Sequence, residues 1–317
     1  MTTLPRSTKR ATTAAIAGIA ALSLTAGLSA CSSDGSDSEK SVTFAAVPAE
    51  SSQTLESTYS NLAKLIEQEA GVKVNFQNAA DYAAVIEGQR AGQIDIASYG
   101  PFSYVIAKDS GVDIDPIAAP TNNKDDAPAY RSIAYVKQGS AIKDLKDVKG
   151  KKVCFVDAAS TSGYLVPSEG LLSVGIDPKN DVEAVMAGGH DASLLGLDSE
   201  QCEVAFAHDS MLTTLEKSGQ IKPDAVKEIW TSNPIPEDPI VLNTSTLDPA
   251  LVDKIREVIQ TKANKPELVK AGICSSEQDC VLPEEIEYGY LPVTDADYNS
   301  IRKICEVTEA DACKNVG

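Results

Sequence analysis

The chain has 317 residues, of which 43% are hydrophobic, so it is long enough for about two domains and apolar enough for a packed core. It carries 28 Lys and Arg against 46 Asp and Glu, a net charge of −18, which argues against nucleic acid as a partner because phosphate backbones are bound through excess basic residues. Only two histidines are present, so a multi-histidine metal site is excluded, and we expect neither a metal nor a cofactor.

The first thirty residues have the layout of an export signal. A basic start with Arg6, Lys9 and Arg10 precedes an apolar run over 11–30, the order of charged and apolar regions in a secretory leader. The run ends in Leu-Ser-Ala-Cys at 28–31, which resembles the bacterial lipobox, where a peptidase cuts before the cysteine and the thiol receives a lipid. The alternative is a transmembrane anchor of about 20 residues, which the hydroxyl residues, the glycines and the processing site disfavour.

This layout makes three predictions for the N-terminal part of the chain. We expect a lipoprotein signal peptide at 1–30, and a lipidated, palmitate-bearing Cys31 that begins a flexible tether over 31–41. The mature protein is then anchored by lipid on the extracytoplasmic face of a bacterial cell membrane.

The cysteine content agrees with export. Six of the seven cysteines remain beside Cys31, and an even number in an oxidising compartment suggests three disulfides. We favour two pairs that bracket short polar loops and the one long-range pair that they leave: Cys274 with Cys280, Cys305 with Cys313, and Cys154 with Cys202. A Cys/His metal site is the competing interpretation, and the sequence disfavours it because it contains no CxxC motif.

From Val42 onward, strand-like runs alternate with helical patterns, the order that builds doubly wound α/β sheets. The first series is predicted as strand 42–47, helix 51–70, strand 72–76, helix 81–91, strand 94–98 and helix 102–109. A long strand at 130–136 leads to a second series: strand 152–156, helix 163–174, strand 182–186, helix 192–198, strand 203–207 and helix 211–219. The same pattern therefore occurs twice, and a last helix is expected at 249–262.

The repeated pattern predicts two α/β lobes. Three prolines between 230 and 242 suit a return crossing from the second lobe to the first. We expect lobe 1 at 42–131 and 239–317, lobe 2 at 132–238, and hinge crossings near 130–137 and 230–240. Two lobes joined in this way leave a cleft, a preferred place for a ligand.

The sharpest local feature is a hydroxyl-rich turn, Ser160-Thr161-Ser162, between a strand and a helix. Backbone N–H groups and the positive end of the helix dipole meet there, so the turn suits an oxyanion. The alternative is an ordinary N-cap, for which one hydroxyl suffices.

Other polar residues follow the predicted strands at the same edge. Gly188-Gly189 lets a backbone approach a ligand, and His190 can donate to an oxyanion, although its spacing alone fits a solvated loop histidine. Tyr99 would face the cleft from the other lobe, or else pack in the core. His208-Asp209 follows another strand, and Asp238 in the proline-rich crossing would hold an ammonium group or accept from a protonated oxyanion.

At these residues the sequence resembles the phosphonate, phosphite and phosphate substrate-binding proteins of bacterial ABC importers. The resemblance covers about 42–291. It rests on Gly71–Asn75, Asp81–Gly88, Asp95–Gly100, Ser160–Pro167, Gly189–Asp191, and the stretches around Ile229-Trp230 and Pro236–Val241.

The resemblance implies a type II periplasmic-binding-protein fold and assigns site residues. In the family, the hydroxyl turn, the tyrosine of the Tyr-Gly step and the histidine of the Gly-His step bind the oxyanion, while an acid faces the other end of the ligand. On this chain they are Tyr99, Ser160, Thr161, Ser162, His190 and Asp238, with Tyr82, Asp209 and Ser210 as weaker candidates. A second acid that holds the amino group of aminophosphonates falls here at Ser210, so phosphite, methylphosphonate and phosphate are rivals for the ligand.

The function that follows is capture of a phosphorus oxyanion in the cleft and its delivery to an ABC permease and its ATPase. We expect a monomer with no catalytic residues. Two alternatives remain, an exported phosphoester or phosphonate hydrolase that uses His190, and a ligand-sensing partner of a membrane receptor. A hydrolase is disfavoured because the sequence has neither a GxSxG elbow nor a triad order.

Overall fold

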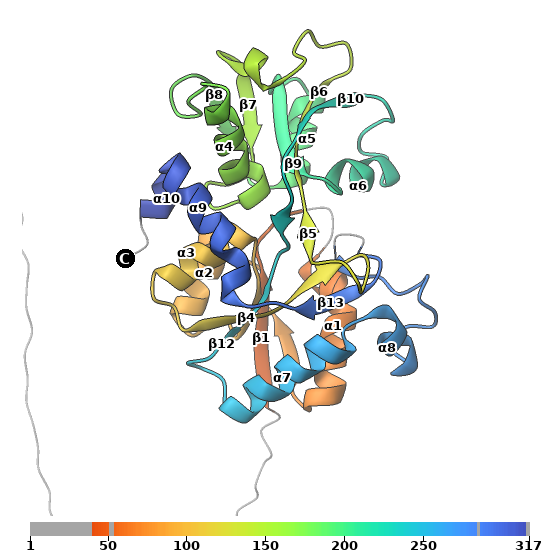
Figure 1. Cartoon of the computed structure of the whole chain (residues 1–317). Helices are drawn as coiled ribbons and strands as arrows, with labels where there is room; N and C mark the ends of the chain where they lie inside the picture. The colour runs from red at the N-terminus through yellow and green to blue at the C-terminus, as the bar shows by residue number, and fades with distance from the viewer. Residues whose placement is uncertain (1–39, 51–53, 284–285, 315–317) are drawn as a thin grey trace, which may run out of the picture. The chain divides into compact units, whose positions relative to one another are not determined.

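A computed structural model describes residues 40–50, 54–283 and 286–314, and two β-sheets organise this part of the chain (Figure 1). The first sheet has the order β13-β4-β12-β3-β1-β2 and the second β10-β6-β9-β7-β8. The first is built from β1 (Ser41–Ala46), β2 (Lys73–Phe76), β3 (Ile96–Ser98), β4 (Ile114–Thr121), β12 (Ile240–Asn243) and β13 (Gly289–Pro292). The second is built from β6 (Ser132–Lys137), β7 (Lys152–Phe155), β8 (Glu183–Met186), β9 (Val204–His208) and β10 (Val226–Thr231).

Helices pack against each sheet to form two lobes. The first lobe has α1 (Leu55–Ala70), α2 (Tyr82–Arg90), α3 (Pro101–Asp109), α7 (Pro249–Lys262) and α8 (Lys265–Lys270). The second has the 3₁₀ turn η1 (Leu145–Val148), the π-helical turn η2 (Thr161–Leu165), α4 (Val166–Ser173), α5 (His190–Asp198) and α6 (Met211–Lys217). The chain closes with η4 (Asp295–Tyr298), α9 (Asn299–Thr308) and α10 (Asp311–Lys314).

Helix α1 illustrates why these residues form these elements. Its Tyr59, Leu62 and Ile66 recur at helical spacing and are buried against the sheet. The side chain of Thr54 accepts a hydrogen bond from the Ser57 N–H and caps the start, while Gly71 ends the helix with a φ of 68°, a conformation that glycine adopts without a steric penalty.

Two antiparallel crossings join the lobes. Strand β5 (Ala129–Tyr130) leaves the first lobe, β11 (Ile235–Pro236) returns to it, and the two strands pair with each other. The strand expected at 130–136 is therefore two strands, because the chain passes from one sheet to the other at Arg131. Both sheets are mixed rather than wholly parallel, since the strands next to the crossings, β6 and β12, run antiparallel to their neighbours. Sequence patterns missed β4, β10, β12 and β13.

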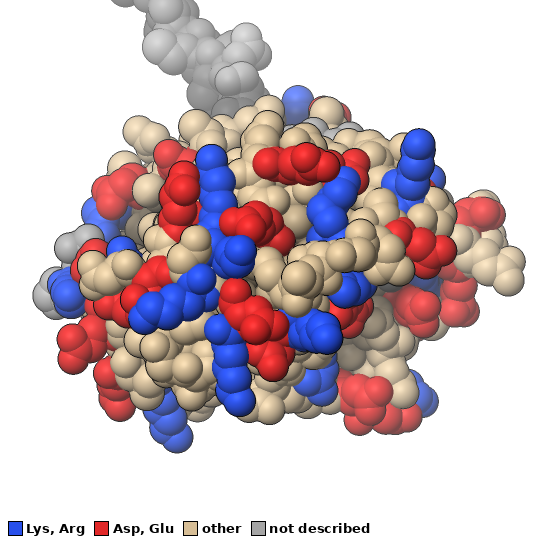
Figure 2. Space-filling model, turned by 90° about the horizontal axis from the view of Figure 1, so that it is seen from above, with Lys and Arg blue, Asp and Glu red and all other residues tan. Residues whose placement is uncertain are grey.

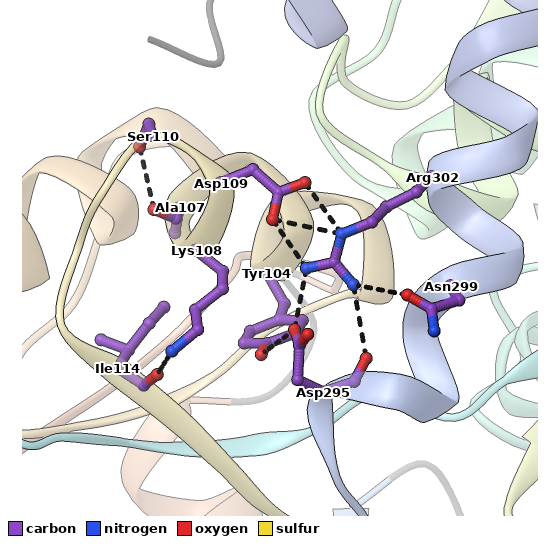
Figure 3. Close-up of polar contacts among 9 residues, drawn as sticks. All are labelled: Tyr104, Ala107, Lys108, Asp109, Ser110, Ile114, Asp295, Asn299 and Arg302. Atoms are coloured by element: carbon purple, nitrogen blue, oxygen red, sulfur yellow. Dashed lines mark hydrogen bonds and ion pairs between the residues drawn. The ribbon is translucent and has the colours of Figure 1, made fainter.

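The C-terminal helices contact both lobes (Figure 1). Arg302 of α9 binds Asp109 at 2.6 Å and Asp295 at 2.8 Å, and the Tyr104 hydroxyl donates to Asp295 at 2.7 Å (Figure 3). These carboxylates raise the pKa of the guanidinium. On the other side, Lys179 of the second lobe pairs with Asp311 of α10 at 2.8 Å.

Three disulfides join the cysteines in the pairing that the sequence favours. Cys154 in β7 bonds to Cys202 just before the neighbouring strand β9, and the two short-range bridges are Cys274–Cys280 and Cys305–Cys313. The predicted signal peptide, Cys31 and most of the tether lie outside the described residues. Among the residues described, none of the helices has the length and apolarity needed to cross a membrane.

Candidate functional site

A small cavity lies where the two lobes meet. Its volume is about 10 Å³, room for the centre of about one water molecule, and eight of its ten lining residues carry a polar side chain. The lining residues are Ala49, Tyr82, Gly100, Tyr130, Ser160, Thr161, Ser162, His190, His208 and Asp238. The first lobe, both hinge crossings and the second lobe all contribute, so a ligand here contacts every part that moves when such a fold opens.

The hydroxyl turn forms one wall. Ser160 caps the helix that starts as η2, and its Oγ accepts a hydrogen bond from the Gly163 N–H at 3.1 Å. The expected N-cap role is thus present, and the Ser160 hydroxyl still has its own proton to donate. Thr161 and Ser162 are 2% exposed, and their N–H groups belong to the first turn, where no intrahelical acceptor exists.

His190 is the first residue of α5 and is 4% exposed. Its Nδ1 accepts a hydrogen bond from the backbone N–H of His208 at 3.1 Å. A backbone N–H can only donate, so the ring proton of His190 lies on Nε2. Burial and the neighbouring His208 lower the pKa of His190 well below its usual value, which keeps the ring neutral and makes Nε2–H a donor.

Tyr130, in the first hinge crossing, completes the hydroxyl cluster. Burial and the carboxylates of Asp238 and Glu237 raise the pKa of its phenol, and the hydroxyl groups of Ser162 and Thr161 oppose part of this rise. The phenol therefore stays protonated. This residue ties the crossing to the turn that would bind the ligand.

Two hydrogen bonds cross the cavity between the lobes. The Phe102 N–H donates to Thr161 Oγ1 at 2.8 Å, and the His190 N–H donates to the carbonyl of Ala49 at 2.8 Å. Gly100 permits this approach, because a Cβ there would lie 3.3 Å from Thr161 Oγ1. The lobes are thus in contact on both sides of the cavity.

The electrostatic character of the cavity comes from helix starts rather than from basic side chains. Tyr82 begins α2, Gly100 caps α3, Ser160 caps η2 and His190 begins α5. Each helix start adds partial positive charge, and together they suit an anion. No Lys or Arg is among the residues that line this cavity.

On the outer face of the second lobe, basic and acidic side chains are interspersed (Figure 2). Several of its lysines form ion pairs: Lys137 with Asp198, Lys149 with Asp181, Lys151 with Glu203 and Lys152 with Glu183.

The structure brings together six of the nine residues singled out from the sequence: Ser160, Thr161, Ser162, His190, Asp238 and Tyr82. It does not place Tyr99 in the cavity. The Tyr99 hydroxyl donates to the carbonyl of Val85 at 3.2 Å in the buried core of the first lobe, so the core alternative holds for this residue. Asp209 and Ser210 are also outside the lining, although Ser210 contacts a lining residue, since its Oγ lies 2.9 Å from Nδ1 of His208.

Sequence reasoning missed Tyr130 as a site residue and did not assign His208 to the ligand. Tyr130 carried a usable signal, because it stands at the predicted hinge crossing, next to any ligand between the lobes. The signal for His208 was its place directly after a buried strand, the same place that pointed to His190.

Comparisons with known proteins point to one family. The family model for the ABC transporter, phosphonate, periplasmic substrate-binding protein matches residues 44–298. A phosphate-import protein, PhnD, of Mycolicibacterium smegmatis is 38% identical over 304 residues, which is 90% of this chain and 94% of that protein. The phosphonates-binding periplasmic protein of Escherichia coli is 32% identical over 73% of this chain and 69% of its own length.

Solved structures place the fold in the same group. The binding protein component of an ABC phosphonate transporter from Pseudomonas aeruginosa has a TM-score of 0.74 and 26% identity, and covers 86% of this chain and 87% of that one. PhnD1 of Prochlorococcus marinus, solved with methylphosphonate, has a TM-score of 0.72 at 17% identity over 86% of this chain and 99% of that one, a likeness of fold.

The expected type II periplasmic-binding-protein fold is thereby confirmed. The relatives are binding proteins rather than enzymes, and neither a hydrolase nor a receptor partner is favoured. The chain belongs to the family of periplasmic substrate-binding proteins of phosphonate ABC transporters.

Proposed function

We propose that this protein captures a phosphorus oxyanion, namely a phosphonate, phosphite or phosphate, in the cavity between its lobes. As a member of its family it works outside the cytoplasm and delivers a small ligand to a membrane permease and ATPase. The observation that carries the proposal is the wall of the cavity, where eight polar side chains and four helix starts converge. Names of the relatives support the ligand class, since one is a phosphate-import protein and another a phosphonates-binding protein.

The carboxylate of Asp238 limits which oxyanions the cavity can bind. A carboxylate in a cavity made for an anion would repel a fully ionised ligand but can accept a hydrogen bond from a protonated one. Near neutral pH, a fraction of the phosphate, phosphite and methylphosphonate ions in solution carries a proton, whereas sulfate carries none. Asp238 would therefore reject sulfate, and the small size of the cavity favours this role over contact with a long aminoalkyl chain.

The ligand would also hold the lobes together. We assign lobe 1 to 42–131 and 239–317 and lobe 2 to 132–238, with crossings near 130–137 and 230–240. An oxyanion that contacts donors of both lobes binds the closed state more tightly than the open state and so shifts the population toward closure. The hydrogen bond from Phe102 to Thr161 would form in that state.

Lipid anchoring belongs to the same proposal. The lipobox-like end of the leader supports cleavage after Ala30 and lipidation of Cys31. The anchored protein would act as a monomer near its permease.

Calorimetric titration of the chain without its first 31 residues tests the ligand class. Phosphate, phosphite, methylphosphonate and 2-aminoethylphosphonate form the panel, with sulfate as the control. We expect tight binding of at least one small phosphorus oxyanion and none of sulfate, and Asp238→Asn should admit sulfate. Sulfate binding by the unaltered protein, or no binding of any of the four phosphorus oxyanions, would reject the proposal.

A further inference from the structure

The only two histidines of the chain contact each other in the cavity wall. Their ring centroids lie 4.6 Å apart at an angle of 66°, and each side chain is 4% exposed. They come from different elements, because His190 begins α5 and His208 ends β9. Sequence analysis assigned a ligand only to His190.

In both rings Nδ1 has a hydrogen-bond partner within the protein. Nδ1 of His190 accepts from the His208 backbone N–H at 3.1 Å, and Nδ1 of His208 lies 2.9 Å from Ser210 Oγ. If the Ser210 hydroxyl donates to that nitrogen, the ring proton of His208 lies on Nε2, as it does in His190. Both rings line the cavity, and with Nδ1 engaged in each, Nε2–H is the group that remains to donate to a ligand there.

Both rings are uncharged near neutral pH. Burial lowers the pKa of His208 to about 4, and burial and the facing His208 lower the pKa of His190. Asp191 opposes the effect at His208 but does not reverse it. Two neutral imidazoles can stand side by side without the repulsion that two imidazolium ions would suffer.

We infer that His208, positioned by Ser210, is a second imidazole donor to the ligand and makes the cavity select inorganic phosphate over phosphonates and phosphite. The inference rests on the proposed function and names the preferred ligand within it. Phosphate has four oxygens, whereas methylphosphonate and phosphite replace one of them with a methyl group or a hydrogen. With polar side chains on eight of ten lining residues, the wall has little apolar surface for such a substituent.

The size of the preference follows from hydrogen-bond energetics. A desolvated N–H that faces a methyl group or a hydrogen loses its acceptor, and a site built to hydrogen-bond a ligand group rejects the analogue that lacks it. We expect the protein to bind phosphate about 10- to 100-fold more tightly than methylphosphonate.

Two variants separate the donor from its positioning residue. His208→Phe removes the donor but keeps a ring against His190, and Ser210→Ala removes only the group at Nδ1. Ser199→Ala is the matched control, because its hydroxyl bonds to the carbonyl of Leu195 at the far end of α5. Titration of the full-length chain in detergent gives the ratio of the methylphosphonate Kd to the phosphate Kd for each protein.

We expect His208→Phe to reduce this ratio about 10-fold or more, Ser210→Ala to reduce it by less, and Ser199→Ala to leave it unchanged. If the unaltered protein binds phosphate but its ratio of methylphosphonate Kd to phosphate Kd equals that of His208→Phe, the inference is overturned and the proposed function stands. An unaltered protein that binds no phosphorus oxyanion overturns both.

Nitrogen NMR of the unaltered protein gives a test that does not depend on folding of a variant. With only two histidines, contacts of each ring with its neighbours in the sequence assign their signals without a variant. We expect both rings to be Nε2–H tautomers and both Nε2 signals to shift on addition of inorganic phosphate. An Nδ1–H tautomer of His208, or a His208 Nε2 signal that does not shift when phosphate is added, would overturn the inference.

Discussion

Replacing His190 with its two amide analogues separates its structural role from its role in binding. The amide of asparagine reaches the place of Nδ1, and that of glutamine reaches the place of Nε2. In the structure, Nδ1 accepts from the buried His208 N–H at 3.1 Å, while Nε2 is the donor assigned to the ligand. Each variant therefore keeps one of the two contacts.

His190→Asn keeps an acceptor for His208 but loses the donor to the oxyanion. A hydrogen bond to a charged ligand is worth about 1.5–3 kcal/mol, so the affinity should fall by about 10- to 100-fold with little loss of stability. His190→Gln keeps a donor but leaves the His208 N–H without its acceptor, which costs about 1–3 kcal/mol. Its Tm should fall by about 2–10 °C while much of the affinity remains.

Calorimetric titration and thermal unfolding of the ligand-free proteins measure the two effects separately. We expect His190→Asn to bind the ligand weakly but keep its stability, and His190→Gln to lose stability but keep much of its affinity. Equal losses of both quantities in both variants, or full affinity in His190→Asn, would refute the tautomer and the donor role deduced for this ring.

Three further predictions concern pH, the hydroxyl turn and the disulfides. The pKa of His208 is lowered from 6.5 to about 4, so as the pH falls from 6.5 toward 4 the unfolded chain gains a proton that the folded chain does not. The free energy of unfolding should therefore drop by about 2 kcal/mol between pH 7 and pH 5 through this residue. Denaturant unfolding of His208→Phe should show a smaller drop over the same pH range. A Cβ on Gly163 would lie 2.3 Å from Val156 Cγ2 and 2.8 Å from Ser160 Oγ, so Gly163→Ala should lower the affinity at least 10-fold, whereas the control Gly150→Ala, with open space around it and a φ of 74°, should lose only about 1 kcal/mol of stability and no affinity. Replacing Cys154 and Cys202, 48 residues apart, with alanine should cost about 4 kcal/mol, and replacing Cys274 and Cys280, 6 residues apart, about 2 kcal/mol; equal losses in chemical unfolding would contradict the loop-length argument.

Much of the fold could be predicted because local patterns and topology agree. Helix α7 begins and ends where its pattern predicts, at Pro249 and Lys262, since a proline start and an apolar stripe mark it locally. Strands β12 and β13 could not be predicted in the same way. They join the first sheet from the far end of the chain, and their pairing with β3 and β4 depends on long-range contacts that no local period records.

Some residues of the candidate site could be predicted from the sequence and others could not, for the same reason. Ser160, Thr161, Ser162 and His190 stand directly after strands, so topology alone brings them to one edge. Tyr99 stands in a similar place, yet its ring turns into the core because the Val85 carbonyl offers its hydroxyl a partner there. Tyr130 stands at the predicted hinge crossing and His208 at the end of a strand, but the partners that each ring meets in the site depend on the tertiary fold and could not be read from the sequence.

A crystal structure of the protein grown with inorganic phosphate tests the central claim most directly. The account predicts a tetrahedral anion between the lobes, with oxygens within hydrogen-bond distance of the Ser160–Ser162 turn, His190 Nε2 and Asp238. An anion bound elsewhere on the protein, or a cavity that stays closed without phosphate at concentrations that saturate binding in solution, would contradict it.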